Sequence, residues 1–236
     1  MSRLKGVLHD PLLTVVVPVF NELATVEEVV RRVVAIPVRV QLVVVDDCST
    51  DGTSDLLGPL ATELGFTLVR QSTNQGKGAA LRRGFEHVQG DLVVIQDADL
   101  EYSPEELPEL ISLICQGRAD VVYGSRFLGR HRVFMFTHYL GNLALTFMTN
   151  VLYNTMLTDM ETCYKVMRAE VLRSMRLESN GFGIEPELTA KIFKRRYRVY
   201  EVPISYDGRG YDEGKKIGWR DGVVAVWVLL KYRFTE

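Results

Sequence analysis

The sequence predicts an α/β fold in which a mostly parallel central sheet is flanked by helices. Short apolar runs of strand type alternate with segments of helical periodicity between about residues 13 and 125, and the loops between them are short. Such alternation is typical of a doubly wound parallel sheet. Polar clusters follow four strands, at the edge where such sheets bind ligands. These clusters are Asn21-Glu22, Asp46-Asp47, Asn74–Lys77 and Asp97–Asp99.

The predicted strands and helices of this part alternate in chain order. The strands are Leu13–Val17 (closed by Pro18), Val40–Val45, Thr67–Arg70, Leu92–Ile95 and Ala119–Tyr123. Their uniformly apolar, β-branched character is typical of strands buried on both faces. The helices are Thr25–Val34, Ser54–Leu64 (interrupted or begun anew near Gly58-Pro59), Lys77–Val88 and Pro104–Gln116. Acidic first turns favour the first and last of these helices.

After about residue 125 the pattern changes. The expected elements are a helical segment at Phe134–Leu157, a candidate re-entry into the sheet at Thr158–Met167, a helix at Glu185–Lys194, a short strand at Val199–Val202 and a terminal amphipathic helix at Gly222–Tyr232. The loop Tyr206–Gly218 is rich in glycine and charge. Since no linker or repeat interrupts the chain, we expect a single domain over residues 1–236 with a C-terminal helical elaboration.

Composition narrows the class of protein. Of 236 residues, 47% are hydrophobic, which is enough for a sizeable core. The net charge of −2 gives no indication of nucleic-acid binding. Three scattered cysteines fit a reducing compartment. Residues Met1 to Asp10 contain no apolar core of signal-peptide length, and no apolar run approaches the length of a membrane span. We therefore expect a cytoplasmic protein, with peripheral membrane contact left open.

The stretch Gln96-Asp97-Ala98-Asp99 is the most informative of the chain. In an extended backbone, residues two apart point to the same side, so we expect the Asp97 and Asp99 carboxylates either to converge on one hard cation or to bind it one directly and the other through water. Mg²⁺ or Mn²⁺ prefers oxygen ligands and commonly bridges protein carboxylates to substrate phosphates. The alternative interpretation is an aspartate-rich turn after a strand.

Two other polar clusters have equally plain alternatives. Asp46 and Asp47 either cap and turn the chain or present a carboxylate to a nucleobase N–H. Gly76-Lys77-Gly78 stands at a helix start, where glycine permits either a tight turn or the close approach of a phosphate. The spacings of a Walker loop and of a dinucleotide-binding G-x-G-x-x-G are absent, which disfavours both of those classes.

Taken in order, the motifs resemble family 2 glycosyltransferases with the GT-A fold. The resemblance spans about residues 13–220 and rests on Val17–Glu22, Val45–Thr53, Asn74–Gly78 and Gln96–Asp99. The branch most similar is that of the dolichyl- or polyprenyl-phosphate sugar synthases. That similarity rests on Gly124–Phe127, Asp159–Lys165 and Glu201–Ile204, followed by Arg209 and Lys215.

The resemblance implies a nucleotide-sugar-binding half at about residues 13–125 and an acceptor-side half at about 126–236. Pro18, Phe20 and Glu22 would shape the nucleoside pocket, Asp47 would bind the base, and Asp46 would support its loop. Lys77, Gln96 and Ala98 are further candidates for donor contacts, and Asp97 and Asp99 would hold Mg²⁺ or Mn²⁺. A cation there would stabilise the negative charge that builds on the leaving diphosphate.

On the acceptor side the resemblance implies a set of cations and two acids. Arg126, Arg209 and Lys215 would neutralise the diphosphate or the acceptor phosphate. Lys165 stands where relatives commonly carry arginine and is a further candidate for contact with phosphate. Asp159 and Glu161 are the candidate carboxylates. An ionised phosphate acceptor needs no general base, so we expect these acids to orient the cations rather than abstract a proton. The glycine-rich loop Tyr206–Gly218 is a candidate lid.

These expectations combine into one leading hypothesis. It is an inverting, metal-dependent glycosyltransferase that moves a sugar from GDP-mannose or a UDP-hexose to a polyprenyl or dolichyl phosphate. The alternatives are a soluble glycan, small-molecule or protein acceptor, and a non-catalytic nucleotide-sugar-binding protein. Phe134–Leu157 and Val223–Phe234 are either core helices or a surface that dips into the cytoplasmic face of a membrane to reach a lipid acceptor.

Overall fold

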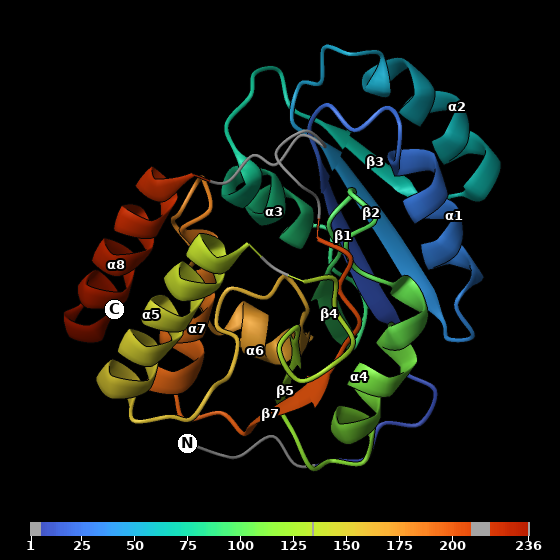
Figure 1. Cartoon of the computed structure of the whole chain (residues 1–236). Helices are drawn as coiled ribbons and strands as arrows, with labels where there is room; N and C mark the ends of the chain where they lie inside the picture. Colours follow the sequence, from blue (N-terminus) through green and yellow to red (C-terminus); the bar gives the residue numbers. More distant parts are fainter. Residues whose placement is uncertain (1–5, 134, 209–217, 236) are drawn as a thin grey trace.

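The structure is a computed structural model, which describes residues 6–133, 135–208 and 218–235. Its strands are β1 (Leu13–Val19), β2 (Val40–Asp46), β3 (Thr67–Arg70), β4 (Leu92–Ile95), β5 (Val121–Ser125), β6 (Lys165–Arg168) and β7 (Val199–Pro203). Its helices are α1 (Val26–Ala35), α2 (Thr53–Leu64), α3 (Lys77–Phe85), α4 (Leu107–Cys115), α5 (Phe136–Tyr153), α6 (Ala169–Arg173), α7 (Ile184–Lys194) and α8 (Trp219–Phe234). A 3-10 turn, η1 (Pro104–Glu106), leads into α4 (Figure 1).

The strands of the described residues form one sheet in the order β3-β2-β1-β4-β6-β5-β7. Neighbouring strands are parallel except around β6, which runs antiparallel to both β4 and β5. The predicted mostly parallel sheet is therefore confirmed, and Thr158–Met167 does re-enter the sheet through β6. Because β6 and β7 come from beyond residue 125, the two parts of the chain share a single sheet.

Helices cover both faces of this sheet (Figure 1). On β2, Leu42 and Val44 belong to the main core together with side chains of α1, α2 and α4, whereas Val43 and Val45 pack with Ala80 of α3. Successive residues of a strand point to opposite faces, so a strand buried on both faces must be apolar throughout. This requirement is the reason that the strands could be recognised from their sequence.

The first strand is longer than predicted, because Pro18 does not end it. Its pairing with β4 stops at Val16, opposite Ile95, while its pairing with β2 continues through Pro18 and Val19. Beyond Val16 the strand is therefore an edge on its β4 side. Proline is tolerated at an edge because no ladder hydrogen bond from its nitrogen is required.

Two helical predictions are also corrected. The helix α2 runs without a break from Thr53 to Leu64 although Pro59 lies inside it. Burial of Leu57 and Leu60 in the core offsets the loss of the backbone hydrogen bond that Pro59 cannot donate. The five-residue helix α6 was not predicted, because five residues are too few to show helical periodicity.

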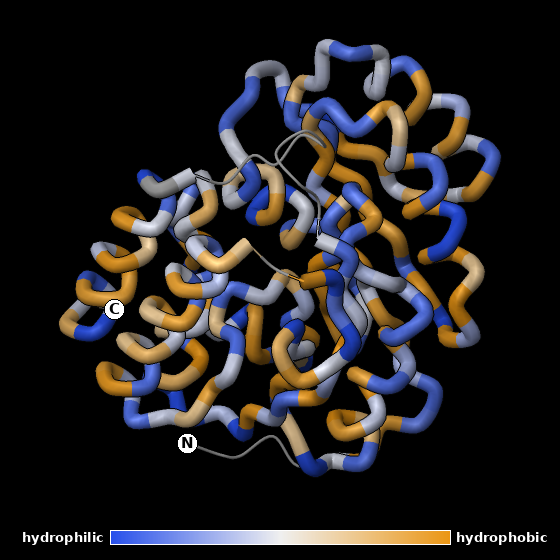
Figure 2. The backbone as a smooth tube through the Cα atoms, viewed as in Figure 1, coloured by the Kyte–Doolittle hydropathy of each residue, from blue (hydrophilic) through white to orange (hydrophobic). Residues whose placement is uncertain are grey.

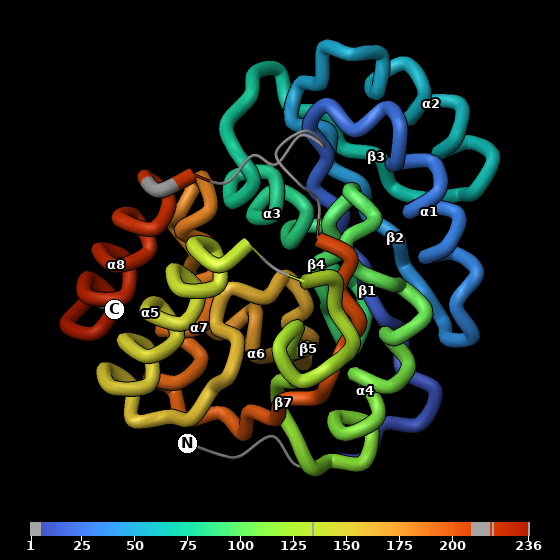
Figure 3. Tube along the Cα trace, viewed as in Figure 1, coloured from blue at the N-terminus to red at the C-terminus, as the bar shows by residue number. Residues whose placement is uncertain are grey.

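The C-terminal part adds a helical layer beside the sheet, as predicted. Figure 3 shows that α5, α7 and α8 lie side by side although they are far apart in the sequence. The Tyr153 hydroxyl of α5 donates to the Leu229 carbonyl of α8 at 2.7 Å, which ties the two helices together. Within the described ranges, no helix combines the length and hydrophobicity that crossing a bilayer requires.

Candidate active site at the carboxyl edge of the sheet

A pocket of about 950 Å³ opens where the four polar clusters of the sequence meet. This volume is within the range of small-molecule sites. Members of every cluster line it: Glu22, Asp47, Asn74, Gly76, Lys77, Asp97 and Asp99. The opposite wall comes from α5, α7 and α8. The convergence expected of parallel strands is therefore present, and a helical wall that the strand pattern did not indicate closes the pocket.

The candidate residues divide into three groups by position. Those that line the pocket are Pro18, Phe20, Glu22, Asp47, Lys77, Asp97, Ala98, Asp99, Arg126 and Glu161. Those that are buried and do not line it are Asp46, Gln96, Asp159 and Lys165. Arg209 and Lys215 lie outside the described residues, as does most of the loop predicted to be a lid.

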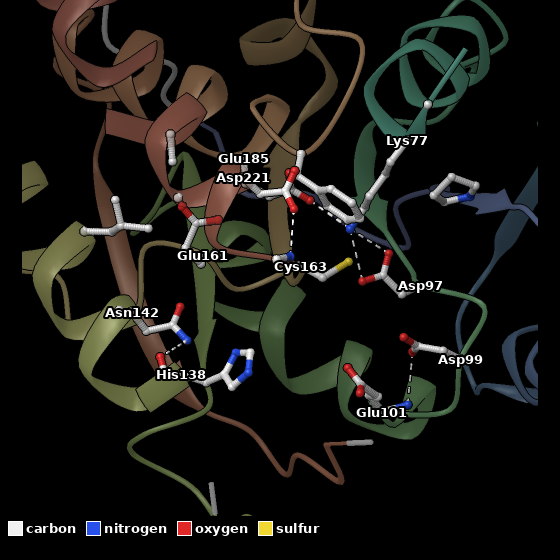
Figure 4. Close-up of a pocket in the computed structure, with 18 of the residues that line it drawn as sticks. Lys77, Asp97, Asp99, Glu101, His138, Asn142, Glu161, Cys163, Glu185 and Asp221 are labelled. Carbon is white, nitrogen blue, oxygen red and sulfur yellow. Dashed lines mark hydrogen bonds and ion pairs between the residues drawn. The ribbon is translucent and has the colours of Figure 1, made fainter. Parts of the chain in front are cut away.

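Asp97 contacts a cation that the protein itself supplies. Lys77 Nζ lies 2.8 Å from Asp97 Oδ1, 3.1 Å from Asp97 Oδ2 and 2.8 Å from Glu185 Oε1. Figure 4 shows the lysine reaching from α3 to both carboxylates. Burial opposes the charge of Lys77, but the two carboxylates outweigh this effect and raise its pKa well above the usual value. The ammonium group is therefore charged at neutral pH.

Asp97 and Asp99 share the pocket because of a turn rather than because of strand alternation. The strand β4 ends at Ile95, and the following turn includes Leu100 with φ of +62°. Asp99 Oδ1 accepts the backbone N–H of Glu101 at 3.2 Å. Figure 4 shows both aspartates on this one segment, facing the pocket. The predicted proximity is present, but the extended-backbone argument for it does not apply.

The two carboxylates fit a divalent cation that takes most of its ligands from outside the protein. Among the residues that the structure describes, no group of three or more His, Cys, Asp and Glu side chains is arranged to hold a metal. Mg²⁺ is commonly bound by one or two carboxylates, with phosphate oxygens and water as its other ligands. Asp97 and Asp99 thus suit Mg²⁺ or Mn²⁺ whose remaining ligands are water or diphosphate oxygens, rather than a site whose ligands all come from the protein.

Asp47 also lines the pocket, and three hydrogen bonds hold its carboxylate. Its oxygens accept hydrogen bonds from Gln71 Nε2 at 2.6 Å, Gln75 N at 2.8 Å and Gly76 N at 2.7 Å. Gly76 has φ of +93°, and a Cβ there would lie 2.7 Å from the Asn180 carbonyl oxygen. The glycine therefore serves a tight turn, and its N–H points to Asp47 rather than to the position of a phosphate.

Two of the buried candidates support the pocket from behind. Asp46 Oδ1 accepts the backbone N–H of Ser49 at 3.0 Å, within the loop that follows β2. Gln96 Nε2 donates to the Asp97 carbonyl at 2.9 Å, and Gln96 Oε1 accepts the Tyr164 hydroxyl at 2.5 Å. These contacts stabilise the two loops that carry the pocket carboxylates, so neither side chain is placed to touch a ligand directly.

The end of β1 contributes Pro18 to the lining, the following loop contributes Phe20, and this loop contacts the turn that carries Asp97 and Asp99. The Glu22 carbonyl accepts the N–H groups at the start of α1. The Thr25 hydroxyl lies 2.7 Å from the Ala98 carbonyl oxygen and donates to it. The predicted nucleoside wall and the turn that carries Asp97 and Asp99 are thus mechanically connected.

Arg126 and Asp159 form a buried bidentate pair. Arg126 Nε and one terminal nitrogen each lie 2.7 Å from an oxygen of Asp159, whose side chain is fully buried. Burial opposes the guanidinium charge, but Asp159 outweighs it and the pKa of Arg126 rises well above its usual value. The Arg126 guanidinium also lies 5.1 Å from the ring centroid of Tyr206. The geometry fits Asp159 as a group that orients Arg126, which itself lines the pocket.

Glu161 and Lys165 differ in their access to the pocket. Glu161 lines it, and burial together with the neighbouring Glu185 carboxylate raises the pKa of Glu161 to about 7. Lys165 is fully buried, its Nζ donates to the Thr162 carbonyl and lies 5.1 Å from the Tyr123 ring centroid, and burial lowers its pKa. The predicted contact between Lys165 and a phosphate does not fit this position, because β6 directs the side chain into the interior.

Sequence reasoning missed the helical side of the pocket. Glu185 of α7, with His138 and Asn142 of α5, lines the pocket and is labelled in Figure 4. Acidic residues are favoured in the first turn of any helix, so the position of Glu185 gave no functional signal. His138 and Asn142 interrupt an apolar segment, and this interruption was the only sign of their role.

The helices α5 and α8 each expose an apolar stripe, and the α8 stripe begins at Val223, which also lines the pocket. The α5 stripe consists of Phe136, Leu140, Leu143, Phe147 and Val151, and the α8 stripe consists of Val223, Trp227, Leu230 and Phe234. Within each stripe the residues are three or four positions apart, and they are between 41% and 81% exposed. Figure 2 shows hydrophobic residues recurring along both helices. The core-helix interpretation is therefore wrong for these sides of the two segments.

Comparison with known proteins identifies the family. The model of the family described as Glycosyl transferase family 2 matches residues 14–176, which is more than half of the chain. The chain belongs to this family. Within the family it is 30% identical to an undecaprenyl-phosphate mannosyltransferase of Micrococcus luteus, over 92% of this chain and 97% of that protein. It is 29% identical to a dolichol-phosphate mannosyltransferase of Pyrococcus furiosus, over 87% of this chain and 59% of that protein.

Both the predicted family and its polyprenyl-phosphate sugar synthase branch are thereby confirmed. The chain spans 59% of the Pyrococcus relative and 52% of a low-salt glycan biosynthesis hexosyltransferase of Haloferax volcanii, to which it is 31% identical. Among solved structures, glucosyl-3-phosphoglycerate synthase of Mycobacterium tuberculosis, in complex with Mn²⁺, UDP and phosphoglyceric acid, matches with a TM-score of 0.75. The match covers 96% of this chain and 80% of that chain at 22% identity, so it shows the fold and confirms GT-A.

Proposed function

We propose that this family 2 chain is an inverting, divalent-metal-dependent glycosyltransferase that moves a hexose from a nucleotide-sugar donor to a polyprenyl phosphate. One observation carries the proposal: a single pocket is lined by the Asp97–Asp99 turn on one side and by α5 and α8 on the other. The same two helices expose the apolar stripes. A charged donor and an apolar acceptor could therefore meet in that pocket. The Micrococcus and Pyrococcus relatives, named as undecaprenyl-phosphate and dolichol-phosphate mannosyltransferases, support this acceptor class.

The donor end of the pocket suits a nucleoside diphosphate. Asp97 and Asp99 would hold Mg²⁺ or Mn²⁺, and the bound ion would offset the charge that develops on the leaving diphosphate. Arg126 supplies a second positive charge to the pocket, and its bidentate pairing with Asp159 fixes the direction of its guanidinium. The solved fold neighbours bind Mn²⁺ or Mg²⁺ together with UDP, which supports a metal-diphosphate donor here.

The acceptor end needs no proton transfer. A polyprenyl phosphate is ionised at neutral pH and can attack the sugar without a general base. We therefore assign Asp159 to orientation of Arg126, and we assign Glu161 to the same charged floor of the pocket rather than to proton abstraction. With Asp47 assigned to the base, the predicted division into a donor half at about residues 13–125 and an acceptor-side half at about 126–236 remains part of this proposal.

The apolar stripes suit a surface that rests on a membrane. A helix with one apolar face and flanking cations binds in the headgroup region of a bilayer, and tryptophan is favoured at that depth. The α8 stripe includes Trp227, and the last turn of α8 carries the cations Lys231 and Arg233. We propose that the protein binds the membrane peripherally through these stripes, which would bring the pocket to the level of a lipid phosphate.

A thermal-shift panel tests the donor half of the proposal. The melting temperature of the full chain is measured with UDP- and GDP-activated hexoses, with and without Mn²⁺ or Mg²⁺. A ligand that binds only the folded state stabilises it in proportion to its affinity. We expect one donor to stabilise the protein in a metal-dependent way and Asp99→Ala to abolish the shift. If no donor stabilises the protein at saturating concentration, the nucleotide-sugar proposal is wrong.

A further inference from the structure

One lysine connects the predicted metal site to a carboxylate that the proposed function does not use. Lys77 Nζ lies within 3.1 Å of both oxygens of Asp97 and 2.8 Å from Glu185 Oε1. The Lys77 and Glu185 side chains are only 15% and 4% exposed, respectively. The ammonium is thus held between two carboxylates on the pocket floor (Figure 4).

Lys77 and a metal ion compete for the same side of Asp97. A Mg²⁺ ion held directly by Asp97 would need a lone pair of a carboxylate oxygen, and Lys77 Nζ now contacts both of these oxygens. The ammonium group and the metal ion would repel each other strongly at such a short separation in a partly buried site. Binding of the metal by Asp97 therefore requires Lys77 Nζ to move away from that carboxylate.

Glu185 can keep the Lys77 ammonium group paired when that group moves away from Asp97. One of its oxygens already pairs with Lys77, and its Oε2 is buried without a hydrogen-bond partner among the described residues. A buried carboxylate oxygen without a partner is costly, so a closer approach of Lys77 would be favourable at Glu185. The lysine could leave Asp97 without becoming an unpaired buried charge.

We propose that Lys77 is a positioning residue that exchanges between Asp97 and Glu185, and that this exchange controls metal binding at Asp97. With the metal bound, Lys77 pairs with Glu185 alone. Without the metal, the ammonium neutralises Asp97. The proposal rests on the proposed metal dependence of the pocket, and it predicts opposite effects for the two partners of one lysine: removing Lys77 tightens metal binding, whereas removing the charge of Glu185 weakens it.

Mn²⁺ binding to the full chain tests this exchange without any donor or acceptor. Free Mn²⁺ is followed by its electron paramagnetic resonance signal for wild type, Lys77→Met, Glu185→Gln and the double variant. We expect Lys77→Met to bind Mn²⁺ about fivefold or more tightly, in the usual range of coupling between sites. We expect Glu185→Gln to weaken binding in the wild-type background and to lose most of this effect once Lys77 is absent.

Matched variants separate the exchange from general electrostatics. Glu161→Gln removes a carboxylate that lines the same pocket but is not one of the two that pair with Lys77, so its effect on Mn²⁺ binding should depend less on Lys77 than the effect of Glu185→Gln does. Lys77→Gln, which keeps a polar side chain, replaces Lys77→Met if the latter does not fold, as judged by its melting transition. Lys77→Met and Lys77→Gln are both expected to tighten Mn²⁺ binding.

Three results would overturn the exchange. They are unchanged or weaker Mn²⁺ binding by Lys77→Met and Lys77→Gln, an equal effect of Glu185→Gln in both backgrounds, and the absence of Mn²⁺ binding by every variant. Because the readout is metal binding, a lack of sugar transfer would contradict the proposed function without deciding this test.

Discussion

The two walls of the pocket are built in opposite ways. On the sheet side, loop residues hold the Asp47 carboxylate by short hydrogen bonds and Lys77 of α3 holds the Asp97 carboxylate, so charged groups are arranged in the pocket before any ligand binds. On the helical side, α5 and α8 present mostly small and apolar residues to the pocket and large apolar residues to the outside. The first wall is suited to charge and the second to an apolar partner.

This contrast shows how one pocket can serve two unlike substrates. A preorganised set of charges stabilises developing charge without the cost of reorganisation. An apolar helical face instead gains free energy from the area it removes from water and needs no fixed geometry. Variants of the sheet-side carboxylates should therefore change catalysis or metal binding, whereas variants of the apolar stripes should change binding to membranes.

The largest effect is expected at the carboxylate wall. Asp99→Ala should lower kcat/KM for sugar transfer by about 1,000-fold, because a cation that stabilises the leaving diphosphate is worth several kcal/mol. The rate is measured with the donor found by thermal shift. Asp55→Ala, at an exposed position in the first turn of α2, is the matched control and should retain the wild-type rate. A near-normal rate for Asp99→Ala would remove the metal from the account.

The next largest effect is expected on stability, from the buried pair of Arg126 and Asp159. Asp159→Ala leaves the Arg126 guanidinium buried without its partner, which should lower the free energy of unfolding by about 3–5 kcal/mol. Urea denaturation measures this change. The double variant Asp159→Ala with Arg126→Met should recover a large part of the loss. A single-variant loss below about 1 kcal/mol would contradict a structural role for this pair.

The apolar wall should respond in membrane binding and not in metal binding. Trp227→Ser should weaken binding to vesicles that contain undecaprenyl phosphate by about tenfold, the loss expected when one large apolar contact is removed. Sedimentation with vesicles measures the bound fraction. Val34→Ser, an exposed apolar position on α1, is the control and should bind as wild type does. Equal binding by both variants would contradict the membrane role of the stripes.

The smallest effect is expected from the pH dependence of Glu161. Its pKa in the folded chain is about 7, above the ordinary value of 4.5, so the folded state retains a proton that the unfolded state releases between these values. The free energy of unfolding should therefore fall as pH rises from about 4.5 through 7, by about 1–3 kcal/mol. Urea denaturation at pH 5 and pH 8 compares wild type with Glu161→Gln, which should lack this part of the fall. Parallel pH profiles would contradict the raised pKa.

The sequence predicted the sheet side of the molecule well for a physical reason. Strands buried on both faces must be apolar throughout, so β1, β2 and β4 could be recognised, and polar residues after them had to meet at one edge. Asp97 and Asp99 were found in this way, although the turn at Leu100, and not the strand, explains their proximity.

The helical side could not be predicted in the same way. Glu185 and His138 reach the pocket only because α5 and α7 pack beside the sheet, and no local pattern encodes that packing. Lys165 was assigned to a phosphate, whereas β6 places it inside the protein, because a short strand does not reveal which face each residue occupies. The apolar segments that form α5 and α8 looked equally like core and like surface until their exposure was known.

Transfer of a labelled sugar tests the central claim most directly. The full chain is incubated with Mn²⁺ and the labelled donor chosen by thermal shift, with undecaprenyl phosphate in vesicles or with 3-phosphoglycerate in solution. We expect label in the lipid fraction that is lost with EDTA and with Asp99→Ala, and little label on the soluble phosphate. Label on the soluble acceptor alone, or metal-independent transfer to the lipid, would contradict this claim.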